Sequence, residues 1–498
     1  MKYDLIIIGG GAGGFAAAIK ANEFRIKTLM VNSGLPIGGT CVNVGCVPSK
    51  FLIHKSKISE IVSPDINFEK IVEEEIDLVE KLRKEKYENV LKNLKNVDFI
   101  EGKAKFVGEN EIEITMDSHG LKNKQINADI QNTRNNADNK NTQINADNNF
   151  PRKSASESDQ RQSASENYPR KSAYELNPRQ SAIKIKAERF ILTVGSSTTI
   201  PSIEGLKEVG YLTHITALKI KKLPKEIVII GAGPVGLEFG QMFKKFGSEL
   251  FILEREPEIL RGEKELLQRL KEILIKEGIK IETNIKVKKV YQREKKVVVY
   301  EKDGKEYQIE GEEILLATGK TPNTQDLGLE KAKVEIDEKK AIKVNEYLQT
   351  SNPNIFAVGD CNNLPLRLET TAAHEGTIAV LNAFNNQNVK INYREVPWTV
   401  FTEPEIAGVG YTEEEVLKKF KTCACRVLDF SLVPKALIIN RTEGMIKMVI
   451  NPQTKQILGI HLLAPQAGDL IYSAVLIIRN KMTIDEVIET LPVFPTIS

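Results

Sequence analysis

The sequence predicts an α/β protein with two Rossmann-like nucleotide-binding domains, followed by a C-terminal α+β domain. Two segments share one order of elements: an apolar strand, a glycine-rich turn, an amphipathic helix and a second strand. The first runs from Lys2 to Asn32, and the second begins at Glu226. This order is typical of a parallel, doubly wound sheet, so each segment predicts one domain. The length of 498 residues agrees, because it exceeds what a single hydrophobic core usually covers.

The boundaries of the other elements follow from their hydrophobic patterns. In the second unit we expect strands at 227–230 and 250–253, with a turn at 231–236 and a helix at 237–246. Further along, 355–360 predicts a strand and 370–384 a helix. In the last block, 391–498, apolar and polar residues alternate at 444–450 and 457–463, which indicates two strands. A helix is expected at 467–480, so this block predicts the α+β domain.

A polar segment at 117–181 interrupts the first domain. It is rich in Asn, Gln, Ser, Arg and Asp, and it repeats the units QINAD and R(K/Q)SA. Such a composition cannot bury a core, so we expect disorder, with a binding tail as the alternative. The flanks at 111–115 and 183–186 alternate like the arms of a hairpin that carries this insert. The expected domains are 1–116 with 182–205, then 206–323, a return to the first domain at 324–390, and 391–498.

Charge, hydropathy and cysteine content narrow the function. With 70 basic and 67 acidic residues, the chain offers no electrostatic reason to expect a nucleic-acid or membrane partner. No uninterrupted apolar stretch approaches the roughly 20 residues of a membrane helix, so we expect a cytoplasmic protein. Five cysteines are too few for a secreted disulfide framework, and a close pair among them indicates catalysis.

The first glycine turn contains Gly9, Gly11 and Gly14 between a strand and a helix. Backbone N–H groups and the helix dipole at such a turn can hold a pyrophosphate. An acidic residue that binds a ribose is expected at the end of the next strand, but Asn32 stands there. Asparagine can still bond a hydroxyl, so a nucleotide site remains the expectation.

The second glycine turn contains Gly231, Gly233 and Gly236, and the strand after its helix ends in Glu254. A carboxylate at this position accepts bonds from both ribose hydroxyls and repels a 2′-phosphate, which favours NADH over NADPH. Arg255 beside it leaves NADPH possible.

Cys41 and Cys46 lie in the stretch GGTCVNVGCVPSK at 38–50, close enough in sequence to form a disulfide. Pro48 suits a helix that begins near Cys46, and a helix N-terminus lowers the pKa of a thiol. Lys50 follows one turn later on the same face. This pattern predicts a redox or nucleophilic pair, whereas the alternatives are two structural cysteines or half of a metal site.

The other cysteines carry a weaker signal. Cys423 and Cys425 form a CAC unit that could in principle hold a soft metal ion. We favour ordinary strand residues that share one face of a sheet. Cys361 is expected to be a small buried residue.

These motifs together resemble the flavoprotein disulfide reductases, the family of glutathione reductase, lipoamide dehydrogenase and mercuric reductase. GGTCVNVGCVPSK is similar to the redox motif of mercuric reductases almost letter for letter, and LLATGKTPNT at 315–324 and FAVGD at 356–360 also match the family. The resemblance implies FAD and NAD(P)H as cofactors, and a homodimer formed through the terminal domain.

The resemblance also implies roles for single residues. Cys46 would be the charge-transfer thiolate and Cys41 the interchange thiol, while Lys50 would pair with Glu238 beside the flavin. The other residues implied at the cofactors are Gly39, Thr40, Ala104, Gly195 and Asp360 for FAD, and Gly319 for NAD(P).

The C-terminus separates the possible acceptors. Phe494, before Pro495, occupies the place where glutathione and lipoamide reductases resemble one another in having a catalytic His. A dithiol or disulfide substrate needs a proton shuttle, whereas a metal ion bound by thiolates does not. Mercuric reductases are similar in placing Phe here, so we expect Hg(II) to bind transiently to Cys41 and Cys46 and to be reduced to Hg(0).

Two departures keep other acceptors open. The chain stops at Ser498, where the resemblance would place a further helix and a Cys–Cys pair, and Thr496 replaces a Tyr. The expectation is a C-terminally truncated mercuric reductase-like enzyme. The alternatives are a lipoamide dehydrogenase-like or quinone reductase with a different acceptor, or a flavoprotein scaffold.

Overall fold

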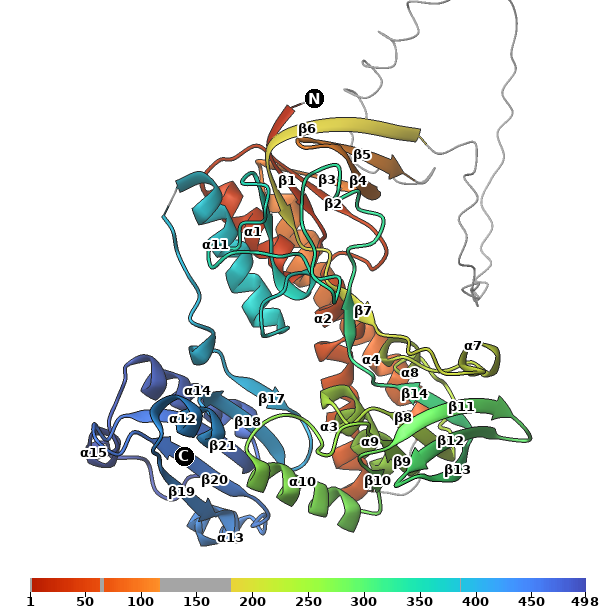
Figure 1. Ribbon diagram of the computed structural model, residues 1–498, viewed down its shortest axis with the longest axis vertical. Helices are drawn as coiled ribbons and strands as arrows, with labels where there is room; N and C mark the ends of the chain where they lie inside the picture. Colours follow the sequence, from red (N-terminus) through yellow and green to blue (C-terminus); the bar gives the residue numbers. More distant parts are fainter. Residues whose placement is uncertain (1, 63–66, 117–180, 386) are drawn as a thin grey trace, which may run out of the picture.

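The computed structural model describes residues 2–62, 67–116, 181–385 and 387–498. The expected disorder of the insert therefore falls outside the described residues, apart from its last position. Two sheets of nucleotide-binding type lie at opposite ends of the molecule, and an antiparallel sheet lies beside the second of them (Figure 1).

The first sheet has seven strands in the order β3-β2-β1-β6-β5-β4, with β16 also paired to β6. Its centre is parallel. The apolar strand β1, which reads LIII at 5–8, pairs with β2 on one side and β6 on the other, and its side chains are buried on both faces of the sheet. Helices α1 (Ala12–Glu23) and α11 (Glu369–Asn385) pack side by side on one face (Figure 1). The strands are β1 (Lys2–Ile8), β2 (Thr28–Asn32), β3 (Val97–Glu101), β4 (Lys103–Gly108), β5 (Glu111–Met116), β6 (Ser181–Leu192) and β16 (Ile355–Ala357).

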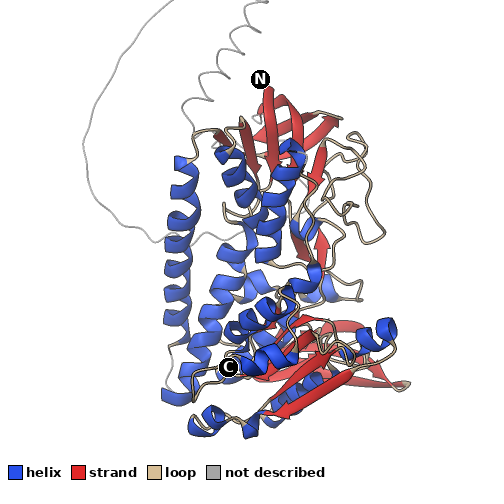
Figure 2. Cartoon of the chain, turned by 90° about the vertical axis from the view of Figure 1, so that its left-hand side faces the viewer, coloured by secondary structure: helices blue, strands red, loops and turns tan. Residues whose placement is uncertain are grey.

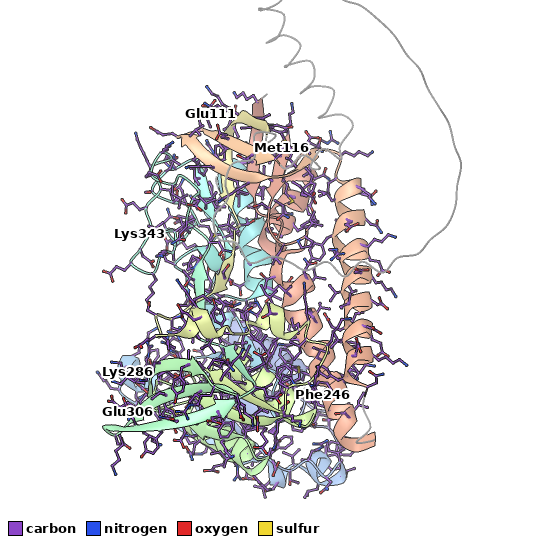
Figure 3. All side chains as sticks on the ribbon, turned by 90° about the vertical axis from the view of Figure 1, so that its right-hand side faces the viewer. Glu111, Met116, Phe246, Lys286, Glu306 and Lys343 are labelled. Carbon is purple, nitrogen blue, oxygen red and sulfur yellow. A yellow bond between two sulfur atoms is a disulfide. The ribbon has the colours of Figure 1, made fainter. Side chains whose placement is uncertain are left out.

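The predicted hairpin that flanks the insert is confirmed. Strands β5 and β6 are antiparallel, and Met116 lies opposite Ser181 in the register. Figure 3 shows Glu111 and Met116 at one end of the molecule, far from Lys286 and Glu306 at the other.

The second sheet is fully parallel in the order β10-β9-β8-β14, and the meander β11-β12-β13 lies beside it. Helix α9 (Pro234–Lys245) begins earlier than predicted, because Pro234 suits the first helical position. The short pair β7 and β15 joins this region to the first sheet. The remaining bounds are β7 (Ser196–Thr198), α7 (Leu206–Val209), α8 (His214–Ala217), β8 (Glu226–Ile230), β9 (Glu249–Leu253), α10 (Lys264–Lys276), β10 (Lys280–Glu282), β11 (Lys286–Gln292), β12 (Lys296–Lys302), β13 (Lys305–Gly311), β14 (Glu313–Leu316) and β15 (Lys320–Pro322).

A helical arm connects the two ends of the molecule. Helix α3 (Cys46–Val62) starts at the first sheet and packs against α9 of the second, and Figure 2 shows long helices spanning this distance. The contact between α3 and α9 brings the region of the cysteine pair to the second nucleotide unit. The other helices here are α2 (Gly39–Val44), α4 (Phe68–Arg83), the π-helix η1 (Lys84–Glu88) and α5 (Asn89–Asn93).

The terminal domain is an antiparallel sheet in the order β17-β18-β21-β20-β19. Helix α14 covers it with a stripe of small and apolar side chains, Ala467, Ile471 and Ala474, which are buried. In the part of the chain that is described, no helix is long and apolar enough to cross a membrane. The elements are β17 (Trp398–Val400), β18 (Glu405–Gly410), α12 (Glu413–Phe420), β19 (Ala424–Asp429), α13 (Pro434–Ile438), β20 (Met445–Ile450), β21 (Ile457–Ala464), α14 (Ala467–Arg479) and α15 (Ile484–Glu489), with short 3-10 turns at Gly359–Cys361, Tyr393–Glu395 and Phe430–Leu432.

Candidate active site

One continuous cavity of about 2340 Å³ connects the two glycine turns, the start of α3 and the edge of the terminal domain. Typical small-ligand sites hold roughly 300–1,000 Å³, so this cavity has room for two extended ligands. Both predicted nucleotide sites and the cysteine pair open into it.

The second glycine turn shows why each glycine is needed. Gly231 has φ +109°, and a Cβ there would overlap the carbonyl group of Ala317, which directly follows the neighbouring strand β14. A Cβ at Gly236 would overlap the carbonyl oxygen of Gly231, so this glycine allows the helix to approach the strand. At Gly233, a Cβ would have no described atom within 4 Å and would project into the cavity. The turn therefore fits a pyrophosphate at the N-terminus of α9.

The first glycine turn repeats this geometry. Gly9 has φ +116° and lies against the backbone of Thr193, while Gly14 lies against the carbonyl oxygen of Gly9. A Cβ at Gly11 would have one close neighbour, the Cα atom of Gly39 at 3.9 Å. The N-termini of α1 and α2 thus meet at a cradle of bare backbone, which fits a second pyrophosphate.

Two single-methyl substitutions separate binding from stability. We expect Gly233→Ala to raise the KM for the nicotinamide coenzyme about tenfold or more at an unchanged melting temperature, because its methyl occupies ligand space. Gly236→Ala should instead lower the melting temperature and reduce the free energy of unfolding by about 1–3 kcal/mol. Its methyl group would clash with the backbone carbonyl group of Gly231. Steady-state kinetics and calorimetry of both variants measure the two effects, and the reverse pattern would contradict the assignment.

Asn32 and Glu254 occupy equivalent places at the ends of β2 and β9. The Asn32 Oδ1 accepts a bond of 2.9 Å from the N–H of Gly10, and the Glu254 Oε2 accepts one of 2.6 Å from the N–H of Ala232. Asn32 also donates to the carbonyl oxygen of Leu35 at 2.9 Å. Asn32 therefore stabilises the first glycine turn by the same type of hydrogen bond with which Glu254 stabilises the second.

Arg255 lines the cavity beside Glu254 but is paired with another carboxylate. Its guanidinium forms an exposed ion pair of 2.8 Å with Glu256. Glu254 lines the cavity, and its Oε1 accepts a hydrogen bond of 2.9 Å from the backbone N–H of Glu256. Of these two residues, the carboxylate is the better placed to contact a ribose.

The cysteine pair lies where α2 ends and α3 begins. Cys41 and Cys46 are free thiols, and Cys46 is the first residue of α3, as predicted. A hydrogen bond from the Cys41 thiol and the smaller effect of the Lys50 charge together lower the pKa of Cys46 to about 7, against the effect of burial. The same hydrogen bond raises the pKa of Cys41 above its ordinary range. Cys46 is thus the thiolate of the pair and Cys41 its proton-bearing partner.

The unequal pKa values predict a pH dependence. Above pH 7 most of Cys46 is thiolate, and below pH 7 the thiolate fraction falls about tenfold per pH unit. We expect reduced protein to be alkylated by iodoacetamide first at Cys46, with a midpoint near pH 7. Peptide mapping by mass spectrometry measures this, and a midpoint near the ordinary thiol value of about 8.5 would refute it.

Lys50 joins three parts of the molecule. Its Nζ lies 2.6 Å from the Glu238 Oε2 on α9 and 4.6 Å from the ring centroid of Phe401 in the terminal domain. The other Glu238 oxygen accepts a bond of 2.9 Å from the N–H of Phe401. Glu238 is buried, so its charge is held by these two partners. The structure therefore brings together the Lys50–Glu238 pair that the resemblance implied.

Two residues near the thiols carried no signal in the sequence. The charge of Glu369, at the start of α11, acts on both thiols, and burial raises the pKa of Glu369. Burial, with smaller contributions from the charges of Cys41 and Glu369, likewise raises the pKa of Tyr87 to about 12. Neither belongs to a recognisable motif, because each is an isolated residue placed by the packing of η1 and α11.

A second polar cluster lies at the β7–β15 junction, and Asp360 is the member of it that is expected from the sequence. The Asp360 Oδ2 accepts a bond of 2.6 Å from the Ser196 hydroxyl. Burial, with a smaller contribution from the charge of Lys320, lowers the pKa of His214 to about 4. The Lys320 Nζ lies 3.1 Å from the His214 Nε2, so the neutral imidazole can accept a hydrogen bond from the lysine ammonium group.

Most of the predicted residues line the cavity, including Gly9, Gly11, Asn32, Gly39, Thr40, Cys41, Cys46, Lys50, Ala104, Gly195, Gly231, Gly233, Glu238, Glu254, Arg255, Gly319 and Asp360. Gly14 and Gly236 pack behind the turns instead. Their role is close packing of helix on strand rather than contact with a ligand.

The prediction that Cys423 and Cys425 are ordinary strand residues was wrong. Their sulfur atoms form a disulfide, with a Cα–Cα distance of 5.7 Å. Cys425 lies in β19 and Cys423 just before it, so the expected shared face brings the sulfurs together. Cys361 is fully buried, as expected.

Known relatives agree with this architecture. The chain is 32% identical over 509 residues to a mercuric reductase of Staphylococcus aureus, which covers 100% of this chain and 80% of the relative. It is equally 32% identical, over 514 residues, to a dihydrolipoyl dehydrogenase of Thermus scotoductus, which covers 100% and 95%. The solved Cu(II) complex of the HOCl-induced flavoprotein disulfide reductase RclA from Escherichia coli shares the fold, with a TM-score of 0.80 at 23% identity over 100% of this chain and 97% of that one.

Family models match nearly the whole chain. The model described as pyridine nucleotide-disulphide oxidoreductase matches residues 3–376, and the model of its dimerisation domain matches residues 396–498. The first alone spans well over half of the sequence. The protein therefore belongs to the pyridine nucleotide-disulphide oxidoreductase family.

Proposed function

We propose that the protein is an NADH-dependent flavoenzyme whose Cys41–Cys46 dithiol reduces Hg(II) to Hg(0). Family membership implies FAD and NAD(P)H, and both glycine cradles leave space for a pyrophosphate. When bound, these cofactors supply the electron pair that reaches the cysteines. The observation that carries the proposal is a thiolate beside a second thiol, in a cavity shared with both cradles.

Each cofactor would be held by its own set of residues. The FAD would lie at Gly9, Gly11, Asn32, Gly39 and Thr40. Ala104, Gly195 and Asp360 would complete that site. The coenzyme would lie at Gly231, Gly233, Glu254 and Gly319.

The two thiols act in sequence on the metal ion. Cys46 is the thiolate at neutral pH and binds the soft Hg(II) ion first. Cys41 keeps its proton until the metal displaces it, and then provides the second sulfur. Lys50 and Glu238 hold their positions through an ion pair of 2.6 Å, so the positive charge stays beside the Cys46 sulfur.

Phe494 favours a metal acceptor over a disulfide, because it stands where glutathione and lipoamide reductases resemble one another in having a catalytic His. Reduction of a disulfide requires a proton for its leaving thiolate, which is usually delivered by an imidazole. Release of a metal ion as an atom requires no such proton.

The experiment is coenzyme oxidation by the flavin-bound enzyme. NADH absorbance should fall when Hg(II) is supplied as a complex with excess low-molecular-weight thiol, and volatile mercury should appear in equal amount. The second candidate, suggested by the dihydrolipoyl dehydrogenase relative, is a small disulfide acceptor. Oxidation driven by lipoamide, without any by Hg(II), would refute the mercury proposal and support that candidate.

The coenzyme preference is assigned to Glu254. Its carboxylate lines the cavity beside the second glycine turn and repels a 2′-phosphate. We expect Glu254→Gln to lower the preference for NADH over NADPH about tenfold, measured as the ratio of the kcat/KM values. Glu272→Gln is the matched control, because Glu272 is an exposed carboxylate beside Arg269 and neither residue lines the cavity. An unchanged ratio in Glu254→Gln would contradict the assignment.

An exposed apolar patch in the terminal domain suits the expected homodimer. The family's dimerisation model matches this domain, which exposes large apolar side chains along α14, α15 and the C-terminal segment. Such a patch is typical of a protein–protein interface. Its most exposed members are Tyr472, Ile488, Leu491, Val493 and Phe494.

A further inference from the structure

The Cys423–Cys425 pair has a third potential ligand beside it. One carboxylate oxygen of Glu413 and the two sulfur atoms all lie within 4.8 Å of one another, and the three residues are half-buried. Glu413 begins helix α12, which ends just before Cys423, so the turn after α12 folds the sulfurs back towards the helix start. Two thiolates and a carboxylate form a ligand set suited to Zn²⁺ and to softer ions.

We propose that Cys423, Cys425 and Glu413 form a second metal site, which binds a thiophilic d10 cation when the disulfide is reduced. The site is separate from the active-site pair, because none of its three residues is among those that line the described cavity. A tetrahedral ion with Zn–S bonds of about 2.3 Å needs sulfur atoms roughly 3.8 Å apart. Breaking the S–S bond allows this separation by side-chain rotation within the same turn.

The redox state of Cys423 and Cys425 therefore controls whether this site can bind a metal ion. A low-molecular-weight dithiol attacks one sulfur of the disulfide, forms a mixed disulfide and then closes its own ring. Two electrons and two protons pass to Cys423 and Cys425, and the reagent leaves as its disulfide. The metal ion then displaces both protons, and the oxidised pair has no thiolate with which to bind it.

The surrounding charges tie the site to the rest of the domain. The Glu413 Oε2 lies 2.6 Å from the Lys447 Nζ, which also contacts Glu263 and Glu265. This lysine holds the Glu413 carboxylate in place beside the two sulfur atoms. Three protein ligands leave one coordination position open, as in sites that exchange their ligands.

The test is Cd(II) binding to flavin-bound enzyme that carries Cys41→Ser and Cys46→Ser, which removes the active-site thiols. After reduction, and removal of the reductant, equilibrium dialysis should find one tightly bound Cd(II) per chain. An ultraviolet sulfur-to-cadmium charge-transfer band should accompany it. Oxidised protein should bind none, and thiol counting in denaturant should show two fewer thiols than in the reduced protein.

Further substitutions in this background assign the ligands. Cys423→Ser with Cys425→Ser should abolish both binding and the band. Glu413→Gln should weaken binding about tenfold or more, whereas Glu265→Gln should change it less than about twofold. Glu265→Gln is matched, because Glu265 also contacts Lys447, at 2.9 Å, but is no part of the site. Absent Cd(II) binding in fully reduced protein, or binding that survives loss of both cysteines, would overturn the proposal.

Discussion

Replacing Cys46 with serine is expected to lower mercury-dependent NADH oxidation by a factor of about 10³ or more. The Cys46 pKa of about 7 makes this residue the thiolate of the pair, whereas a serine hydroxyl stays protonated and binds soft metals poorly. Flavin content, measured by absorbance, should be unchanged, because the substitution replaces one atom at the cavity wall. The measurement is the initial rate of NADH oxidation with the Hg(II)–thiol complex.

Cys361→Ser is the matched control for this variant. Cys361 is fully buried, and its thiol is hydrogen-bonded to the carbonyl oxygens of Leu192 at 3.5 Å and Val358 at 3.3 Å. A serine hydroxyl can donate to the same acceptors, so the rate should stay within about twofold of the unmodified enzyme. If the Cys46→Ser enzyme kept more than about a tenth of the rate, Cys46 could not be the essential thiolate.

Replacing Lys447 with methionine is expected to cost about 3–5 kcal/mol of unfolding free energy. Lys447 is 1% exposed, and its Nζ contacts carboxylate oxygens of Glu263, Glu265 and Glu413 at 2.6–2.9 Å. Burial lowers the pKa of Lys447, but the hydrogen bonds to these carboxylates raise it above its ordinary value. Without the lysine, three like charges face one another, and one of them, Glu263, is buried. Urea unfolding followed by tryptophan fluorescence measures the loss, since Trp398 lies in this domain.

Lys276→Met is the control, because it removes a similar contact between α10 and the terminal domain at the surface. The Lys276 Nζ lies 2.9 Å from a Glu443 oxygen, and the lysine side chain is 79% exposed. Its loss should cost about 0–1 kcal/mol. Adding Glu263→Gln to Lys447→Met should recover part of the stability, because it neutralises the buried carboxylate. Equal costs for the two lysine variants would refute this account of the cluster.

The active-site features that the sequence predicted are those set by short spacings. The turns at Gly9 and Gly231 need positive φ and a close strand, and these local requirements appear directly in the glycine pattern. The start of a helix at Cys46 and the position of Lys50 one turn later follow from helix geometry alone. Residue spacing is sufficient wherever the partners lie within a few positions of one another.

Features that join distant segments were decided by the tertiary structure. Glu238 lies 188 positions from Lys50, and the two meet because α3 packs against α9. Spacing alone carries no information about that packing, so resemblance to a family was needed to pair them. The placement of Glu369 and Tyr87 beside the thiols, and the burial of Lys447, likewise depend on how separate elements pack.

The CAC unit shows the division most clearly. The sequence by itself determined that Cys423 and Cys425 can share one face, because alternate strand residues point the same way. Whether they stay apart, form a disulfide or face a carboxylate depended on the return of the chain after α12, which places Glu413 beside both sulfurs. Local periodicity sets the direction of a side chain, whereas long-range packing sets its neighbours, and chemistry at this protein's sites requires both.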